Sequence, residues 1–217
     1  MRKVILNFID RQSMIENEQP MGKKWIEMAT NKEAIHLLDI LWTRLLADQS
    51  AKKDVHSFGN AHEHGEGAKK TKVRDWQSFR NVQELGAAGI HLEYNHSSCL
   101  RMITFSKKWN FYPGILKLPP IIVDDLTGPK FLNLIAYEMC LDFDNDFGIT
   151  SYISFLDSLI DESKDFIDLR SSGILRNLLG SDEEVARVFN EIGTNLVPKP
   201  KIYRIVRSQI QELYDKK

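Results

Sequence analysis

Residues 169–192, LRSSGILRNLLGSDEEVARVFNEI, decide the fold of the C-terminal half of this chain. Ser181 and Glu184 form a capping box, because each side chain can accept a hydrogen bond from the backbone N–H of the other residue. The stretch therefore predicts a helix that begins after Ser181, preceded by a shorter helix over about 164–171 that ends at Gly173. The helix after Ser181 would bury Val185, Val188, Phe189 and Ile192.

Further helices are expected on both sides of this stretch. Gly128-Pro129 fits a helix start, because proline is tolerated in the first turn. Thr30 and Glu33 form a second capping box. Gly89 would end a short helix. The apolar spacing predicts helices over residues 3–17, 31–47, 78–88, 128–141, 149–161 and 202–214.

Between these helices the apolar pattern changes to the alternation of strands. Pro119 and Pro120 lack backbone N–H groups, so the strands on either side of them should lie at a sheet edge or at a bend. The predicted class is α+β: mostly α-helical, with a small antiparallel β-sheet at about 91–124. Four stretches form it: HLEYN (91–95), CLRMITFS (99–106), ILKLP (115–119) and IIVDD (121–125).

The overall composition is that of a globular domain that needs no disulfide or structural metal to fold. The 217 residues include 29 basic and 30 acidic side chains, a net charge of −1. That balance argues against a nucleic-acid partner, which would select a strongly basic domain. Two cysteines, Cys99 and Cys140, are too few for a disulfide framework or a four-cysteine zinc site. No secretory signal or membrane span is recognisable, since no apolar run approaches roughly 18 residues.

Residues 48–74 differ in character from the rest of the chain. They are rich in glycine, histidine and alternating charge, and Val55 and Val73 are their only aliphatic residues larger than alanine. Such a segment can bury little surface. We therefore expect an N-terminal helical segment at 1–47, a flexible linker at 48–74, and an α+β domain at 75–217 that is part of one larger domain.

Two sequence patterns suggest a metal site, but both match the known metal-binding motifs poorly. His56, His62 and His64 lie in the expected linker without a nearby cysteine, so solvated loop histidines are the favoured interpretation over zinc ligands. The run Asp142, Asp144, Asp146 resembles a calcium loop. It lacks glycine at position 6 and glutamate at position 12, so an exposed turn between helices is favoured over a calcium site.

No catalytic signature is present either. The acidic neighbours of Cys140 would suppress its thiolate, so a buried structural cysteine is expected there. No nucleophile elbow, phosphate-binding loop or dinucleotide fingerprint occurs. We therefore assign no catalytic, cofactor-binding or metal-ligating residue and no cofactor. Asn95-His-Ser97 is the sole glycosylation sequon and would matter only in a secretory lumen.

Charge is unevenly distributed along the chain. Residues 142–168 carry a local net charge of −7 and residues 199–217 one of +4, and Lys69, Lys70, Lys72 and Arg74 form a further basic cluster. Solvated helix faces and a solvated loop explain these runs. A basic C-terminal end could alternatively lie beside a membrane surface.

Six sequence blocks, taken in order, resemble the plant domain-of-unknown-function 247 family, also known as UPF 0481-type proteins. The resemblance extends over about 31–217, and its most specific block is 169–192. The other blocks are HLLDILWTRLL (36–46), VQELGAAGI (82–90), ILKLPPIIVDD (115–125), FLNLIAYEMC (131–140) and ITSYISFLDSLI (149–160).

The chain also departs from the pattern of that family. Members usually have a longer N-terminal half and a transmembrane helix after the terminal amphipathic helix, whereas this chain stops at Asp215-Lys-Lys217. The resemblance therefore implies the C-terminal half of the family's domain without its membrane anchor, as a truncated or divergent short member. We expect this chain alone to be soluble and cytoplasmic, in a family that is membrane-associated.

The function that the resemblance implies is a non-enzymatic recognition or interaction domain. Pollen-side self-incompatibility in some grass members suggests a recognition or signalling role with an unidentified protein partner. Membrane contact would come only through the family's C-terminal helix, absent here. Two alternatives stay open. One is an unrecognised metal-dependent hydrolase that uses His56, His62, His64 or the 142–146 aspartates, and the other is a non-functional fragment.

Overall fold

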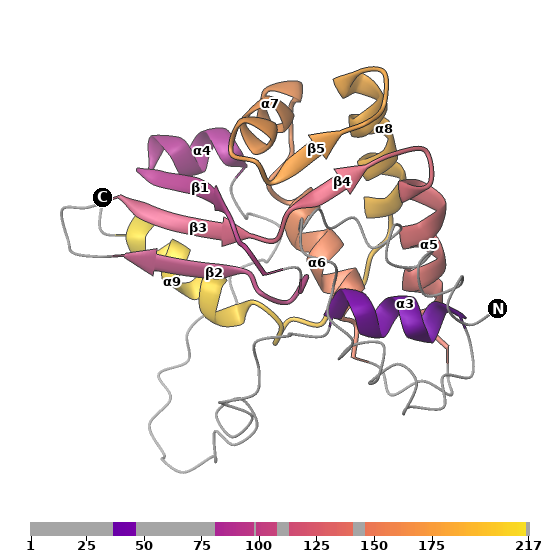
Figure 1. Ribbon diagram of the computed structural model, residues 1–217. Helices are drawn as coiled ribbons and strands as arrows, with labels where there is room; N and C mark the ends of the chain where they lie inside the picture. The colour runs from indigo at the N-terminus through magenta and orange to yellow at the C-terminus, as the bar shows by residue number, and fades with distance from the viewer. Residues whose placement is uncertain (1–36, 47–80, 98, 108–112, 141–145, 216–217) are drawn as a thin grey trace, which may run out of the picture.

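The computed structural model describes residues 37–46, 81–97, 99–107, 113–140 and 146–215 (Figure 1). The α+β class is confirmed, with helices predominating over two small sheets. No helix within these ranges is both long enough and apolar enough to cross a bilayer. The helices are α3 (Leu37–Leu46), α4 (Val82–Ala87), α5 (Thr127–Glu138), α6 (Gly148–Asp157), α7 (Ser163–Ser171), α8 (Asp182–Gly193) and α9 (Arg204–Tyr214). The strands are β1 (Ile90–Tyr94), β2 (Thr104–Lys107), β3 (Gly114–Leu118), β4 (Ile121–Val123) and β5 (Leu175–Asn177).

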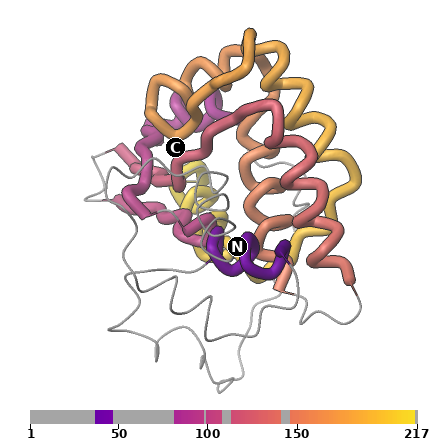
Figure 2. Tube along the Cα trace, turned by 45° about the vertical axis from the view of Figure 1, so that its right-hand side comes forward, coloured from indigo at the N-terminus to yellow at the C-terminus, as the bar shows by residue number. Residues whose placement is uncertain are grey.

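Helix α6 is the centre of the core. Every residue from Gly148 to Ile153 is buried, as are Phe155 and Leu156, so the helix has no solvent-facing side over most of its length. A helix that is buried all round must be enclosed by other elements. Helices α5 and α8 pack against it and against each other, as Figure 2 shows, and α3 crosses near its first turn.

The three-stranded sheet has the order β1-β3-β2 and is mixed, which corrects the expectation of an antiparallel sheet at 91–124. Strand β2 pairs with β3 in antiparallel register, as expected, but β1 pairs with β3 in parallel. The chain reverses direction twice between β1 and β3, so the two strands run the same way once β3 takes the central position. Glu93 lies opposite Lys117 in this register, and their side chains form an ion pair of 2.9 Å.

The chain leaves this sheet at Pro119 and Pro120. Strand β4 follows the bend and pairs in parallel with β5. The sequence pattern does not predict β5, since only helices are expected after residue 125. The Tyr152 hydroxyl of α6 donates a hydrogen bond of 3.3 Å to the Pro119 carbonyl, so the bend rests on the central helix. The two prolines therefore mark the boundary between two sheets.

The helix ends that a capping box or a glycine marks agree with the structure, whereas the helices predicted over 78–88, 128–141 and 149–161 are shorter, at Val82–Ala87, Thr127–Glu138 and Gly148–Asp157. Ser181 and Glu184 form the predicted capping box of α8. Gly89 and Gly173 follow α4 and α7 with φ of +77° and +71°, the left-handed conformation that glycine tolerates. The predicted helix over 3–17, the Thr30–Glu33 box and the 48–74 linker lie outside the described residues. The proposed domain boundaries therefore stay a prediction.

A buried carboxylate joins three helices at the first turn of α6. Glu138, the last residue of α5, is fully buried. Its Oε1 accepts hydrogen bonds from Trp42 Nε1 of α3 (2.7 Å) and from the Ile149 backbone N–H (2.8 Å). Its Oε2 accepts from the backbone N–H (2.9 Å) and hydroxyl (2.7 Å) of Thr150. Backbone N–H groups at a helix start have no partner within the helix, and a negative charge is favourable there.

We expect Glu138→Gln to lower the free energy of unfolding by about 2–4 kcal/mol, because its amide would turn two donor hydrogens toward groups that are themselves donors. Urea unfolding followed by circular dichroism measures this. Glu191→Gln, on an exposed turn of α8, is the control and should change stability by less than about 0.5 kcal/mol. Equal stability of the two variants would show that Glu138 does not hold the three helices together.

Candidate functional site

A cleft with a volume of about 760 Å³ opens beside the C-terminal half of α6. One wall comes from α6 and the turn that follows it, and the other from the connection between α8 and α9 and the first turn of α9. The residues that line the cleft are mostly polar: Asn81, Ser151, Ser154, Asp157, Ser158, Asp161, Asn190, Lys199, Tyr203 and Arg207. The apolar members are Ile160, Leu196, Pro198, Pro200 and Ile202.

The two walls carry opposite charge. Asp157 and Asp161 belong to the acidic stretch 142–168, and Lys199 and Arg207 belong to the basic stretch 199–217. The fold thus brings into one cleft two charge runs that the sequence pattern alone predicts to be separate solvated surfaces. That charge asymmetry was the signal in the sequence that could have indicated the cleft.

One buried tyrosine, one backbone contact and one cation–π contact hold the basic wall in place. The Lys199 backbone N–H donates to Ser151 Oγ of α6 at 3.0 Å. Tyr203 has φ of +61°, and its buried hydroxyl donates to the Leu100 carbonyl at 2.9 Å. The Arg207 guanidinium lies 4.9 Å from the centre of the Phe155 ring, a cation–π contact. Burial lowers the pKa of Arg207 to about 10, and the group stays charged at neutral pH.

Asp157 is the distinctive group of the acidic wall. Its half-buried carboxylate forms no hydrogen bond or ion pair with any other residue of the described chain. Burial alone raises its pKa above the ordinary value of 3.8. A Cβ placed on Gly193 would lie 2.5 Å from Asp157 Oδ1, so only a glycine lets the end of α8 come this close. The carboxylate is therefore partly desolvated and has no partner among the described residues.

The cleft is lined by polar groups of several chemical types. It offers hydroxyl, amide, carboxylate and cationic groups but includes neither a histidine nor a cysteine. The histidines that the structure describes, His91 and His96, lie elsewhere, on and just after β1. A serine in this cleft would therefore need a base other than histidine to become a nucleophile. The same groups are well suited to hydrogen-bond a polar ligand.

Of the metal-site candidates from the sequence, the structure describes only Asp146, which does not line this cleft. His56, His62, His64, Asp142 and Asp144 lie outside the described residues, as does the cluster of Lys69, Lys70, Lys72 and Arg74. Asp146 forms an ion pair with Arg101, which also lies 6.0 Å above the Trp42 ring. Asp146 thereby attaches the β1–β2 connection to the start of α6. The described ranges hold no group of three or more His, Cys, Asp or Glu residues placed to bind a metal ion.

The expectation of a buried cysteine at position 140 is wrong. Cys140 is exposed just beyond the end of α5, next to Met139, whose side chain is 62% exposed. The face of α5 that ends there points away from α6, so position 140 falls on the solvent side. Cys99 is the buried cysteine, and its Sγ donates to the Leu46 carbonyl at 3.1 Å.

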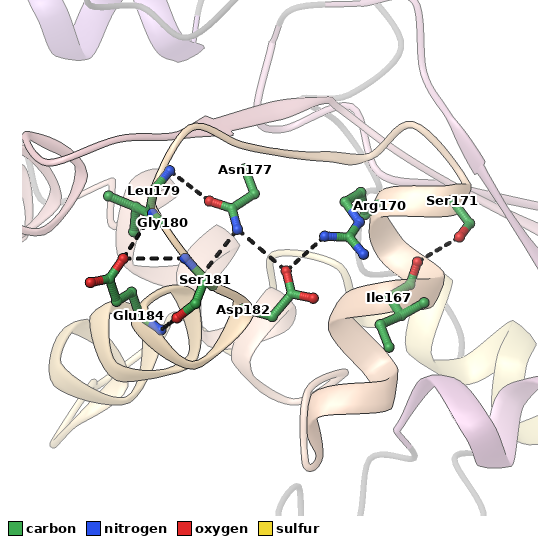
Figure 3. A network of polar contacts seen from close by, with 9 residues as sticks. All are labelled: Ile167, Arg170, Ser171, Asn177, Leu179, Gly180, Ser181, Asp182 and Glu184. Carbon is green, nitrogen blue, oxygen red and sulfur yellow. Dashed lines mark hydrogen bonds and ion pairs between the residues drawn. The ribbon is translucent and has the colours of Figure 1, made fainter.

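Many polar residues of the 169–192 block form a network of hydrogen bonds and ion pairs at the start of α8 (Figure 3). Asn177 Oδ1 accepts from the Leu179 N–H at 2.7 Å, and its amide nitrogen donates to the Ser181 carbonyl at 3.2 Å. Asp182 forms an ion pair of 2.9 Å with Arg170 and so joins α7 to α8. The groups of this network satisfy one another, which indicates a structural role.

The sequon asparagine is engaged in a similar local network. Asn95 Nδ2 donates to the Met102 carbonyl at 2.6 Å, and Oδ1 accepts from the Ser97 N–H at 3.0 Å. The Asn95 side chain therefore holds the β1–β2 connection in its turn.

Comparison with known proteins gives a consistent family match. The model of the family DUF247, described as plant protein of unknown function, matches residues 1–217. The chain is 31% identical over 111 residues to the putative UPF0481 protein At3g02645 of Arabidopsis thaliana, an alignment that covers 51% of this chain and 20% of that protein. It is 26% identical over 181 residues to the UPF0481 protein At3g47200 of the same plant, covering 81% of this chain and 37% of that protein. No solved structure matches.

We expect Asp157→Asn to be at least as stable as the wild-type chain at neutral pH. A carboxylate with a raised pKa in the folded state contributes stability that is present below 3.8 and is lost as the pH rises through the folded pKa. The variant lacks this loss, so the difference in melting temperature between variant and wild type should grow from about zero at acid pH as the pH rises. Thermal melts from pH 3 to 8 measure it, with exposed Asp125→Asn as the control. A variant whose melting temperature falls below that of the wild type as the pH rises would contradict the absence of a stabilising partner for the Asp157 carboxylate.

The cysteines should differ in reactivity. A water-soluble thiol reagent should modify one thiol per native chain, at Cys140, and both thiols after unfolding, because access to the thiolate controls the rate. Peptide mapping identifies the modified residue. Rapid modification of Cys99 in the native chain would contradict its burial.

Proposed function

Because the chain belongs to the DUF247 family of plant proteins of unknown function, we propose that it is a non-enzymatic recognition domain that binds a protein partner in the cleft beside α6. The observation that carries the proposal is the cleft itself, in which an acidic and a basic wall face each other. A partner segment with complementary charges would be oriented by the two walls. The chain spans 20% and 37% of the two Arabidopsis proteins it resembles, so the proposal concerns the recognition step and not the whole protein.

Exposed apolar side chains that are close in sequence to the cleft residues support a protein partner. Val197 is 72% exposed and lies between the lining residues Leu196 and Pro198. Ile205 is 66% exposed on the first turn of α9, between the lining residues Tyr203 and Arg207. Interfaces between proteins combine such exposed apolar groups with a polar rim. A small polar ligand would leave both side chains uncovered.

Membrane association and a signalling role form a further part of this proposal. Their support is the family resemblance of the six sequence blocks. A recognition domain held at a membrane would present the cleft to a partner from the same membrane or from its surroundings.

A cleft-filling substitution tests the proposal. Ser154 lies on the wall formed by α6, and Ser154→Trp should occupy the space that a partner would enter. We expect the wild-type chain to retain at least one protein from a plant membrane extract that Ser154→Trp does not retain. That protein, once purified, should bind the wild-type chain in calorimetry, with an affinity at least tenfold weaker for the variant.

Ser171→Trp is the matched control, because Ser171 is exposed at the end of α7 and takes no part in the cleft. It should bind the partner as the wild-type chain does, and both tryptophan variants should melt cooperatively. Equal binding by Ser154→Trp would place the partner surface elsewhere. Turnover of a substrate by the pure chain, lost in Ser154→Trp, would make the site enzymatic and overturn the proposal.

A further inference from the structure

We propose that Asp157 is the anchor point of the cleft and that it binds the ammonium or guanidinium group of a basic side chain of the partner. This inference rests on the proposed function and names the chemistry that the partner supplies. The geometry behind it is a half-buried carboxylate in a cleft, placed against the end of α8 and without a protein partner among the described residues.

The carboxylate has lost part of its hydration in the free protein, and no described residue compensates for that loss. Partial burial removes water from a charged group, and a hydrogen bond or an opposite charge normally compensates for that loss. Glu138 and Asp165 are the fully buried carboxylates of the described chain, and both follow the rule, since backbone N–H groups donate to each of them. Asp157 is only half-buried and its carboxylate still reaches solvent in the cleft, but no described residue donates to it, although the cleft also contains Lys199 and Arg207. A charged group from outside the chain would supply the missing compensation.

The surroundings favour an organic cation over a metal ion. A metal would require several oxygen or nitrogen ligands, and no such group of His, Cys, Asp or Glu exists among the residues that the structure describes. The cleft instead combines one carboxylate with hydroxyl and amide groups, including Ser154 and Asn190. Leu196, Pro198 and Ile202 add an apolar surface on which the methylene groups of a lysine or arginine side chain can lie.

Gly193 positions the carboxylate. With a methyl group at this position, Asp157 Oδ1 would be only 2.5 Å from the new carbon, so the carboxylate would have to rotate away. Gly193→Ala therefore keeps the charge of Asp157 and changes its place. This variant separates a requirement for negative charge in the cleft from a requirement for that charge at this point.

The test titrates the 217-residue chain with N-acetyl-arginine amide, N-acetyl-lysine amide and the neutral N-acetyl-citrulline amide, followed by amide chemical shifts in nuclear magnetic resonance. We expect the two cationic probes to shift signals of cleft residues and the citrulline probe to bind at least tenfold more weakly. Asp157→Asn and Gly193→Ala should each weaken binding of the cationic probes at least tenfold, while exposed Asp125→Asn binds as the wild type does. The first variant should stay folded, since it removes an uncompensated charge.

Several outcomes would overturn the inference. They are the absence of binding by both cationic probes, equal binding of the citrulline probe, or unchanged affinity in Asp157→Asn. A parallel titration uses agmatine, a small cationic amine. If agmatine binds more tightly than the blocked amino acids, the site takes a small amine instead of a protein side chain. A partner that Ser154→Trp loses but Asp157→Asn retains would leave the proposed function standing and remove only Asp157 as its anchor.

Discussion

The carboxylate of Glu138 is the constraint on which the rest of the structure depends. It meets the first turn of α6, the helix that is buried over most of its length, and it receives the Trp42 indole from α3 in the same place. A charge buried this deeply is tolerated only while every donor around it stays in position. The arrangement therefore sets the depth at which α6 sits and the direction in which it leaves the core. The C-terminal end of α6, which carries Asp157, follows from that direction.

Local signals in the sequence predicted local structure well. The Ser181–Glu184 box and the glycines at 89 and 173 act through neighbours within a few residues, and each ends or begins a helix where expected. The pairing of strands depends on residues far apart in the chain, and here the predictions were weaker. The three residues of β5 are too few to show a period, and their partner β4 lies more than fifty residues earlier. The parallel pairing of β1 with β3 likewise depends on the central place that β3 takes in its sheet.

The cleft shows the same division between local and distant information. Each run of charge was visible in the sequence, but their meeting was not, because it requires the connection between α8 and α9 to return to the side of α6. Cys140 was misplaced for a related reason. Its acidic neighbours describe its chemistry, whereas its exposure depends on which face of α5 is covered by α6 and α8. Residue type identified the groups, and packing decided which of them meet.

The turn around Leu100 has a consequence for how the chain assembles. Its N–H donates to the Leu45 carbonyl, and its own carbonyl accepts from the Tyr203 hydroxyl, a residue 103 positions away. Trp42 and Glu138 are separated by 96 positions. Each contact closes a long loop, and the entropy lost in closing it precedes any gain from the packing that follows. A chain so rich in helix would ordinarily fold through neighbouring contacts. We expect this chain instead to fold at the slower rate that is typical of proteins with many non-local contacts. The reason is that α6 becomes buried only when segments from both ends of the described chain pack against it.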